Sequence, residues 1–260
     1  MPFGVRIKVV FIILFYFLLL SVSAVFVLFV CPFCFLITLF LIVSGLYALF
    51  VFYPKFDPTG FSLIRLKGGS KKIALTFDDG PDPVVTPMIL DILKSYSLKA
   101  TFFCLGFKAK QYPEIIERIR NEGHTLANHG YSHAKLHNKN TDFIKSEIER
   151  AEKVLEPLTL LSGKKLFRAP HGFKNFTLIK VLRQNNYILA GWSRGIWDSD
   201  GSDADILMKR ALNYLEDGVI YLFHDGRDDI GKGINTVEFL KRFIENVTER
   251  GYVITNNLFE

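Results

Sequence analysis

The sequence predicts an α/β domain preceded by a membrane-embedded hairpin of two helices. From residue 71 onward, short β-rich runs alternate with segments of helical periodicity as far as the C-terminus. Such alternation is typical of parallel strands joined by crossover helices, which close into a barrel or remain an open sheet. Before that, no charged residue occurs between Lys8 and Lys55, and the intervening run is almost wholly Phe, Leu, Ile and Val.

The apolar run from Val9 to Tyr53 is too long for one crossing of a membrane. As a single helix at about 1.5 Å per residue it would be roughly twice as long as the ~30 Å hydrocarbon core. Cys31-Pro32 is the natural break because proline is poorly tolerated inside a helix, which gives spans of 9–30 and 33–53. A cleaved signal peptide is the alternative, but cleavage near Ala24 would still leave a second apolar span.

Basic residues flank the hairpin on both sides. Arg6 and Lys8 precede the first span and Lys55 follows the second, whereas the short connection carries no charge. The positive-inside rule then predicts both ends in the cytoplasm, for a protein integral to a bacterial inner or cell membrane and in contact with its lipid. A single tilted span with a re-entrant half would instead place the globular part outside. Without these three residues the 32 basic side chains fall to 29 against 26 acidic ones, which excludes a nucleic-acid-binding footprint.

A linker and one domain follow the anchor of residues 1–55. Residues 56–70 are rich in Gly and Pro and predict a linker, and residues 71–260 are ample for one hydrophobic core. The expected strands are residues 73–77, 100–105, 124–128, 166–168, 187–192, 219–223 and 252–255. The expected helices are residues 86–96, 113–121, 141–155, 203–215 and 236–247, with one more after Asn175.

Two adjacent carboxylates follow the first strand of this domain. The apolar run Ile73 to Phe77 ends at Asp78-Asp79, and Gly80-Pro81 then turns the chain. In parallel α/β folds ligands collect at the carboxyl ends of the strands, and adjacent residues of an extended chain point to opposite sides. Asp78 and Asp79 can therefore serve two tasks, such as accepting a proton and ligating a metal. The alternative is an ordinary surface turn.

Two histidines four residues apart form a second candidate cluster. His129 and His133 lie in the segment Asn128-His129-Gly130-Tyr131-Ser132-His133, where a helical turn would bring both imidazoles to one face. Catalytic zinc usually takes three protein ligands and keeps an open position for water. Asp79, His129 and His133 would supply such a set. Without an acidic partner the histidine pair would be read as a solvated turn.

Three more segments place chemical groups where strands should end. Arg168-Ala169-Pro170-His171-Gly172 carries an arginine that can pair with a carboxylate. Trp192 and Trp197-Asp198 bring indoles suited to the apolar face of a sugar, and the apolar run from Val219 ends at His224. Each alone has a structural explanation: an arginine–proline turn, core tryptophans or a hydrogen-bonded histidine. Five strand ends that carry such groups together favour an active site.

The order and spacing of these segments resemble the polysaccharide deacetylase family, the carbohydrate esterases with a nodulation-B homology domain. The resemblance runs from about Lys71 to the C-terminus and is close at Thr76-Phe77-Asp78-Asp79-Gly80 and at His129 to His133. Ala100-Thr101-Phe102-Phe103 and Glu122-Gly123-His124 are also similar to the family. The resemblance implies a distorted (β/α) barrel and a divalent metal, usually zinc.

The resemblance also implies roles for the matching residues. Asp78 would be the catalytic base and Arg168 would orient it. His224 would be the general acid, and Asp198 would polarise it. The metal ligands would be Asp79, His129 and His133.

A further set of residues would line the substrate site. Leu222 would help to form the acyl pocket, and the backbone N–H of His171 would face the oxyanion. The full set is Pro170, His171, Trp192, Trp197 and Leu222. The sequence departs from the family's usual pattern at His171, where a Tyr is typical, and at Gly195 and Ser199, where an Asp and a Trp are common. These differences lie in the walls of the substrate groove more than at the reaction centre, so they affect the expected identity of the polymer substrate before the expected chemistry.

The predicted activity is metal-dependent hydrolysis of an N-acyl group, above all N-acetyl, from an amino sugar. The hairpin favours a membrane-associated glycan or a polyprenyl-linked saccharide as the substrate of a domain that faces the cytoplasm. Peptidoglycan or an exported polysaccharide, met by a domain that faces outward, is the alternative. A non-catalytic carbohydrate-binding domain on a membrane anchor is a third hypothesis, and it is disfavoured because the carboxylates and the histidines are all present.

Overall fold

The computed structural model describes residues 18–22, 32–67, 71–226, 229–231 and 233–259. The chain forms two compact units, residues 1–50 and 51–260. All the strands described here belong to the second unit.

One described helix is long and apolar enough, by length and composition, to cross a membrane. This helix, α2 (Pro32–Phe52), has 21 residues and no charged side chain. It begins at Pro32, which suits proline because the first N–H groups of a helix have no partner within it, and it corresponds to the predicted span 33–53. Of the predicted span 9–30, only residues 18–22 are described, and they are helical; the remainder lies outside the described residues. The two-helix hairpin is therefore not shown.

The described strands form one parallel sheet with the order β1-β6-β5-β4-β3-β2-β8-β7, and β9 pairs with the first residues of β2. Crossover helices return the chain to the same end of the sheet, and this is why the strands are parallel. The strands are β1 (Ser62–Leu63), β2 (Lys72–Asp78), β3 (Thr101–Cys104), β4 (Thr125–Asn128), β5 (Lys165–Phe167), β6 (Tyr187–Ala190), β7 (Arg194–Gly195), β8 (Val219–His224) and β9 (Val253–Thr255).

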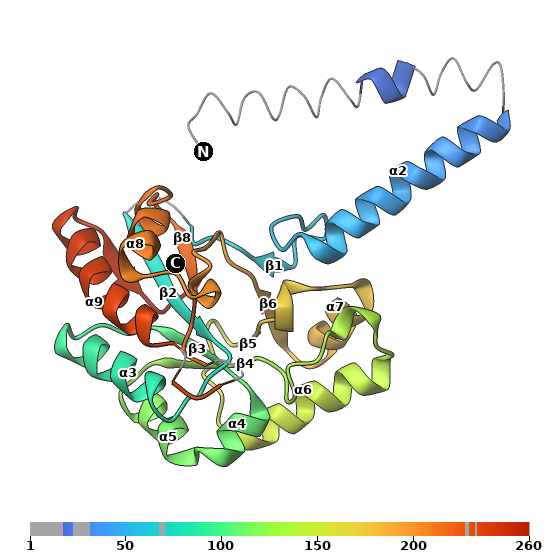
Figure 1. Ribbon diagram of the computed structural model, residues 1–260. Coiled ribbons are helices and arrows are strands. Elements are labelled where there is room, and N and C mark those ends of the chain that lie inside the picture. The colour runs from blue at the N-terminus through green and yellow to red at the C-terminus, as the bar shows by residue number, and fades with distance from the viewer. Residues whose placement is uncertain (1–17, 23–31, 68–70, 227–228, 232, 260) are drawn as a thin grey trace. The chain divides into compact units, whose positions relative to one another are not determined.

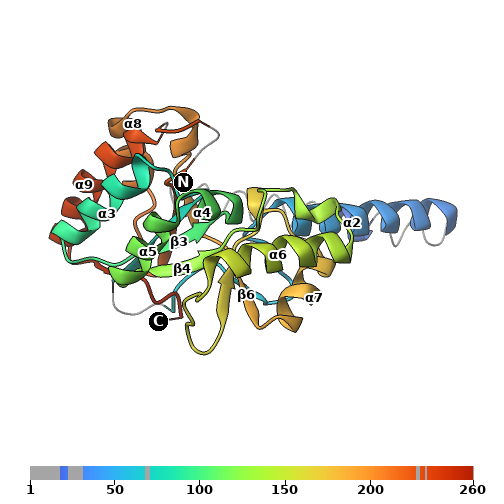
Figure 2. The same ribbon diagram turned by 90° about the horizontal axis from the view of Figure 1, so that it is seen from below.

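Helices form a layer outside the sheet. Helices α3, α5 and α9 lie next to one another outside the strands, and α4 and α6 continue this layer (Figures 1 and 2). The helices are α3 (Val85–Ser95), α4 (Gly106–Gln111), α5 (Pro113–Asn121), α6 (Thr141–Leu155), α7 (Phe176–Gln184), α8 (Ala204–Leu212) and α9 (Ile234–Glu249), with short 3₁₀ turns η1 (Leu136–Asn138), η2 (Pro170–Gly172) and η3 (Asp198–Asp200).

Part of the segment expected to be a linker belongs to the sheet. Ser62 and Leu63 of β1 pair with β6, and the N–H of Leu66 donates to the carbonyl of Gly218 at 2.9 Å. Residues 62–66 thus connect the β6 side of the sheet with the β8 side. A strand of two residues is too short to show a period-two pattern, so it could not be predicted from the sequence.

Alternation along β2 determines which side chains reach the inner face of the sheet. Ile73, Leu75 and Phe77 belong to the main hydrophobic core beneath the helices, whereas Ala74 belongs to a smaller cluster on the inner face. Because side chains alternate along a strand, Asp78 shares the inner face with Ala74. Register then brings the strand ends to one rim, since Asp78 pairs with His224 of β8.

Candidate active site

Asp78 and Arg168 form a buried ion pair on the inner face of the sheet. Nη1 of Arg168 donates to Oδ1 of Asp78 at 2.7 Å and to Oγ1 of Thr76 at 2.6 Å. Nη2 and Nε donate to the carbonyls of Gly191 at 2.8 Å and Ala190 at 3.2 Å. Every nitrogen of the guanidinium therefore has a partner, as burial of a charge requires, and Asp78 is held in one orientation.

Asp79 points away from Asp78, toward the two histidines. Its φ of 71° lies in the left-handed region, which turns the chain directly after the strand. Its Oδ1 lies 3.1 Å from Nε2 of His129 and 3.1 Å from Nε2 of His133. Nζ of Lys108, on α4, donates to the backbone carbonyl of Asp79 at 2.9 Å and so supports this turn.

The loop that carries the two histidines is not helical. The predicted helical turn over 129–133 is wrong: the segment follows β4 as an irregular loop, with positive φ at Gly130 and His133. Glu147 of α6 organises the loop, because its Oε2 accepts from the N–H groups of Tyr131 at 3.2 Å and Ser132 at 2.8 Å, and from the Ser132 hydroxyl at 2.9 Å. The loop places both imidazoles where the helical hypothesis expected them, beside Asp79.

The chemistry of this donor set fits a cation. The Nδ1 of His129 lies 2.9 Å from the carbonyl of Arg168; a carbonyl only accepts, so Nδ1 carries the hydrogen and Nε2 of the neutral ring presents a lone pair. That lone pair faces Oδ1 of Asp79, which is buried and has no hydrogen-bond partner among the described residues. The three ligand atoms of Asp79, His129 and His133 lie within 4.8 Å of one another. Two imidazoles and a carboxylate are a ligand set that zinc accepts.

The pKa shifts of Asp79 and His129 indicate that the carboxylates of the cluster are stabilised by a neighbouring positive charge. Burial opposes ionisation of Asp79, but the neighbouring imidazoles outweigh burial and hold the pKa of this carboxyl well below its usual range. Burial likewise opposes the charged form of His129, but Asp78 and Asp79 outweigh it and raise its pKa. Protons on the imidazoles, or a cation bound in their place, would balance the negative charge of Asp78 and Asp79.

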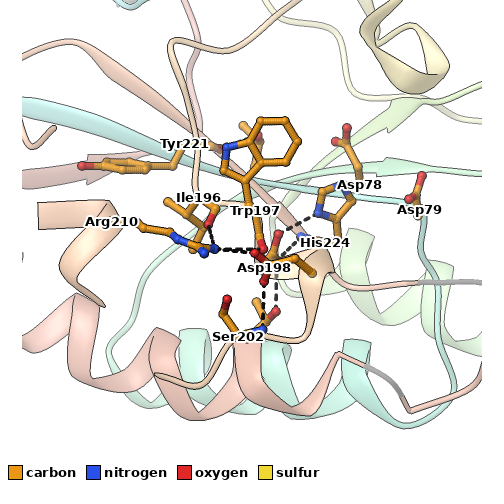
Figure 3. Close-up of polar contacts among 12 residues, drawn as sticks. Asp78, Asp79, Ile196, Trp197, Asp198, Ser202, Arg210, Tyr221 and His224 are labelled. Atoms are coloured by element: carbon orange, nitrogen blue, oxygen red, sulfur yellow. Dashed lines mark hydrogen bonds and ion pairs between the residues drawn. The ribbon is translucent and has the colours of Figure 1, made fainter. Parts of the chain in front are cut away.

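His224 lies on the other side of Asp78, at the end of β8. Its Nδ1 donates to Oδ1 of Asp198 at 2.8 Å, and its backbone N–H donates to Oδ2 at 2.8 Å. Figure 3 shows the imidazole between Asp198 and Asp78. Burial disfavours the imidazolium, but the charge and hydrogen bond of Asp198, with Asp79 and Asp78 beyond, outweigh burial and raise the pKa of His224 to about 9. A histidine of this kind holds its proton at neutral pH.

The expected substrate-site residues lie around this centre in different ways. The rings of His171 and His133 contact each other in a tilted arrangement with centroids 4.4 Å apart, and His171 has a φ of 60°. Pro170 is buried, and its ring lies where a Cβ on Gly130 would be in van der Waals contact with it. Leu222, on the same face of β8 as His224, is 8% exposed.

The two tryptophans differ in exposure. Trp192 is half-buried and covers the guanidinium of Arg168, with 5.6 Å between Cζ and the ring centroid. Trp197 is 72% exposed, at a φ of 58°. Trp197 is thus the tryptophan that is mostly exposed to solvent, and Figure 3 draws its indole in the same view as His224.

Three residues of the site were missed from the sequence: Lys108, Glu147 and Asp225. Asp225 is fully buried, accepts from the Thr86 hydroxyl at 2.7 Å, and lies where a Cβ on Gly80 would clash. Burial raises the pKa of Asp225 to about 7. Glu147 alone gave a signal, as an acidic residue among the apolar positions Ile144, Ile148 and Ala151 of α6. Lys108 gave none, because lysines are common on exposed helix faces.

Fold and site together define the class: a (β/α) barrel with paired carboxylates, a candidate metal centre and a charged histidine at the carboxyl rim. The sequence model of the polysaccharide deacetylase family matches residues 65–190. A peptidoglycan-N-acetylglucosamine deacetylase of Bacillus cereus is 32% identical over 206 residues, which cover 75% of this chain and 91% of that protein. The chain therefore belongs to the polysaccharide deacetylase family, and it is a hydrolase that acts on carbon–nitrogen bonds other than peptide bonds.

Other relatives agree with this assignment. A chitooligosaccharide deacetylase of Azorhizobium caulinodans is 33% identical over 162 residues, which cover 62% of this chain and 77% of that protein. The crystal structure of a peptidoglycan N-acetylglucosamine deacetylase in complex with a benzamide ligand matches with a TM-score of 0.72 at 32% identity, over 78% of this chain and 97% of that chain. The predicted barrel of the family is thereby confirmed for the C-terminal unit.

Proposed function

We propose that this protein is a metal-dependent N-deacetylase that removes an acetyl group from an amino sugar of a membrane-associated glycan or a polyprenyl-linked saccharide. The observation that carries the proposal is the convergence of Asp78, the ligand set of Asp79, His129 and His133, and His224 at one rim of the sheet. The names of the relatives, peptidoglycan N-acetylglucosamine and chitooligosaccharide deacetylases, support an N-acetylated amino sugar as substrate.

A divalent cation, zinc by its ligand preference, would be held by Asp79, His129 and His133, and would supply Lewis acidity toward water and the acyl oxygen. Asp78 accepts the proton of the attacking water. Its Oδ2 lies 3.9 Å from Nε2 of His129, so the base stands beside the ligand set. Arg168 fixes the other carboxylate oxygen and leaves Oδ2 for this task.

His224 acts as the general acid in this proposal. Water adds to the acyl carbon, the carbon–nitrogen bond breaks, and the nitrogen leaves as an amine only if it receives a proton, because an amide anion is a poor leaving group. Asp198 orients the ring through Nδ1, which directs Nε2 toward the substrate side. The products are acetate and the free amino sugar.

Residues in the walls of the site are proposed to contact the oxyanion, the acetyl methyl and the sugar ring. The backbone N–H of His171 is the proposed donor to the oxyanion, and the left-handed conformation of this residue determines where that N–H points. Leu222 is placed to contact the acetyl methyl, and Trp197 offers an exposed indole for a sugar face.

Peptidoglycan, met by an outward-facing domain, is the second candidate substrate, and the names of the relatives favour it. The two candidates require the C-terminal unit on opposite sides of the membrane. The basic flanks of the apolar region favour the cytoplasmic side. A C-terminal fusion to a reporter that is active only outside the cytoplasm tests the orientation. Reporter activity would place the C-terminal unit outside and make peptidoglycan the preferred substrate of the proposal.

The test of the activity is acetate release by the full chain, purified in detergent and supplied with zinc, from an N-acetylated chito-oligosaccharide. The wild type should release acetate, and the Asp78→Asn variant should bind zinc equally but release none. If the wild type binds the oligosaccharide without releasing acetate, the non-catalytic carbohydrate-binding alternative replaces the proposal.

A further inference from the structure

The chain that leaves the apolar helix α2 is fixed to the wall of the candidate active site. The backbone N–H of Lys174 donates to the carbonyl of Val51 at 3.2 Å. The ammonium of the same lysine donates to the carbonyls of Tyr53 at 3.3 Å and Pro54 at 2.9 Å. Lys174 is only 2% exposed, and the two hydrogen bonds of its ammonium are partly buried. The segment Val51–Pro54 is therefore part of the second unit and not a free tether.

This segment lies a few contacts away from the metal-ligand set. The ring of Phe52 packs on Phe173 with centroids 5.3 Å apart, and Phe173 stacks on His171 at 5.8 Å. The ring of His171 contacts that of His133 in a tilted arrangement at 4.4 Å. A Cβ on Gly172 would lie 2.8 Å from Pro54 and 2.5 Å from Trp192, so no space separates the segment from the wall. The segment Val51–Pro54 and the site wall are thus packed together within the second unit.

The surface around this segment is aromatic and basic. We define the exit face as Phe52, Tyr53, Lys55, Lys135 and Phe176. The three aromatic side chains are 53%, 49% and 56% exposed. Phe52 contacts the ring of His137 at 5.3 Å, and the charge of Lys135 acts on the same imidazole, so Lys135 lies at the edge of this face. Phe176 follows Asn175, whose side chain donates to the carbonyl of His137 at 2.8 Å.

These features match the boundary of an anionic bilayer. Helix α2 is uncharged over 21 residues and at about 1.5 Å per residue is as long as the ~30 Å hydrocarbon core. Its last residue, Phe52, begins the exit face. Aromatic side chains gather at membrane–water interfaces, and lysines beside them attract anionic headgroups.

We infer that the exit face rests on an anionic lipid bilayer, and that the site draws its amino sugar from a glycan held in that same bilayer by a lipid tail. The inference rests on the proposed deacetylase function with its membrane-held substrate, and it adds the face of the second unit that meets the bilayer. Because Lys174 fixes the segment Val51–Pro54 to the site wall, the site is restricted to sugars close to the membrane. A glycan anchored in the same bilayer meets that restriction, and sharing a surface raises its effective concentration.

The position of the exit face is tested by fluorescence. Trp192 packs against Gly172 beside Pro54, and the sequence has only 2 tryptophans, so the Trp197→Phe variant leaves Trp192 as the sole reporter. The full-length variant is reconstituted in vesicles of phosphatidylglycerol and phosphatidylcholine in equal parts, with lipids brominated near the headgroup. Trp192 emission should be quenched relative to vesicles without bromine. Equal emission would show that the exit face stands away from the bilayer, whatever the enzymatic activity.

The substrate is tested by comparing one N-acetylated oligosaccharide in two forms, attached to a lipid in the same vesicles or free in solution. The wild type should deacetylate the lipid-held form faster, on the order of a hundredfold at equal bulk concentration. The Tyr53→Ser, Phe176→Ser double variant should lose most of this preference and keep its rate on the free form. Val253→Ser removes a similarly exposed apolar side chain (55%) on β9 and should change neither rate.

The outcomes separate the two proposals. Equal rates on both forms overturn the inference and leave the deacetylase function intact. Acetate release from neither form overturns the proposed function, and Trp192 emission still decides the position of the exit face.

Discussion

The side chains of Arg168 and Asp78 form an ion pair that is closed to solvent, with 2.7 Å between Nη1 and Oδ1 and side-chain exposures of 0% and 5%. The backbone carbonyl of the same arginine accepts from Nδ1 of His129 at 2.9 Å. One residue therefore orients the proposed base through its side chain and a proposed metal ligand through its backbone. These two functions can be separated by mutation, because only the first is lost when the side chain changes.

Replacing Arg168 by Met should leave the Asp78 carboxylate buried without its partner. Removal of one member of a buried ion pair typically costs ~3–5 kcal/mol, so the free energy of unfolding should fall by about that amount and turnover should be lost. Zinc binding should persist because the carbonyl that orients His129 remains. Denaturant unfolding of the full chain in detergent and metal content after dialysis measure both effects.

The matched control is Arg210→Met. Arg210 pairs with Asp200 at 2.8 Å, but both side chains are about a third or more exposed (33% and 41%), and exposed ion pairs contribute little to stability. If the Arg168 and Arg210 variants unfold at the same denaturant concentration, the assignment of Arg168 as the buried partner of Asp78 is wrong.

Two further variants should each lose one function: the first should lose metal binding, and the second should lose proton donation but keep the metal. Asp79→Ala removes the carboxylate that lies 3.1 Å from both imidazoles and should abolish zinc binding. His224→Ala should keep stoichiometric zinc and lose turnover, because His224 is not part of the ligand cluster. Metal analysis after gel filtration and acetate release give the two readouts. Full activity of the His224 variant would exclude this residue as the acid.

The sequence predicted which side chains lie together at one rim of the sheet better than it predicted the local structure that places them there. Asp78 and His224 were recognised because an apolar strand that stops at a charged residue is a local pattern, and parallel strands bring such ends to one rim. The loop over 129–133 was predicted as helical because a four-residue spacing fits a helix, but the positive φ of Gly130 and His133 breaks that geometry. Both imidazoles lie beside Asp79 as expected, but an irregular loop and not a helical turn places them there.

Side chains from distant helices were beyond sequence reasoning. Lys108 reaches the Asp79 carbonyl only because α4 follows β3 directly, and the short helix Gly106–Gln111 was not predicted. Strands β1 and β7, of two residues each, were also missed, since such elements depend on neighbours already in place. The order of the elements and the gathering of polar residues at the carboxyl ends of the strands could be predicted from the sequence. The contacts between elements could be seen only in the tertiary structure.

Glu147 should be necessary for the metal site although it touches no ligand atom. Its Oε2 accepts three hydrogen bonds from residues 131 and 132, between the two histidines. Glu147→Ala leaves these donors without a partner, at a cost of ~1–3 kcal/mol each where they stay buried, and frees the loop. We expect lower stability and weaker zinc affinity, measured by competition with a chelator.

Glu149→Ala is the control for this experiment. Glu149 lies on the same helix, is exposed and faces Lys145 at 3.6 Å, so its loss should leave zinc affinity unchanged. Unaltered zinc affinity in the Glu147 variant would mean that the loop holds its shape without the carboxylate.

The pH dependence of turnover should report the pair of His224 and Asp198. The proposed acid must carry a proton, and because its pKa is raised to about 9, it stays protonated through neutral pH and loses its proton as the pH rises through that value. The rate should therefore fall above about pH 9. A cation bound beside Asp79 would cancel part of the carboxylate charge and lower this limit, so the comparison is made between variants that hold equal zinc.

Asp198→Asn removes the largest influence that raises the pKa of His224 and leaves burial, which lowers it. The alkaline limb of the kcat profile should then move to lower pH, while the rate well below the new pKa recovers toward that of the wild type.

Asp200→Asn is the control, because Asp200 lies two residues away, pairs with Arg210 and makes no hydrogen bond to His224 among the described contacts. Its profile should match that of the wild type. Coincident alkaline limbs in the Asp198 variant and the wild type would show that a different group supplies the proton, because a carboxylate 2.8 Å from Nδ1 must affect the titration of that imidazole.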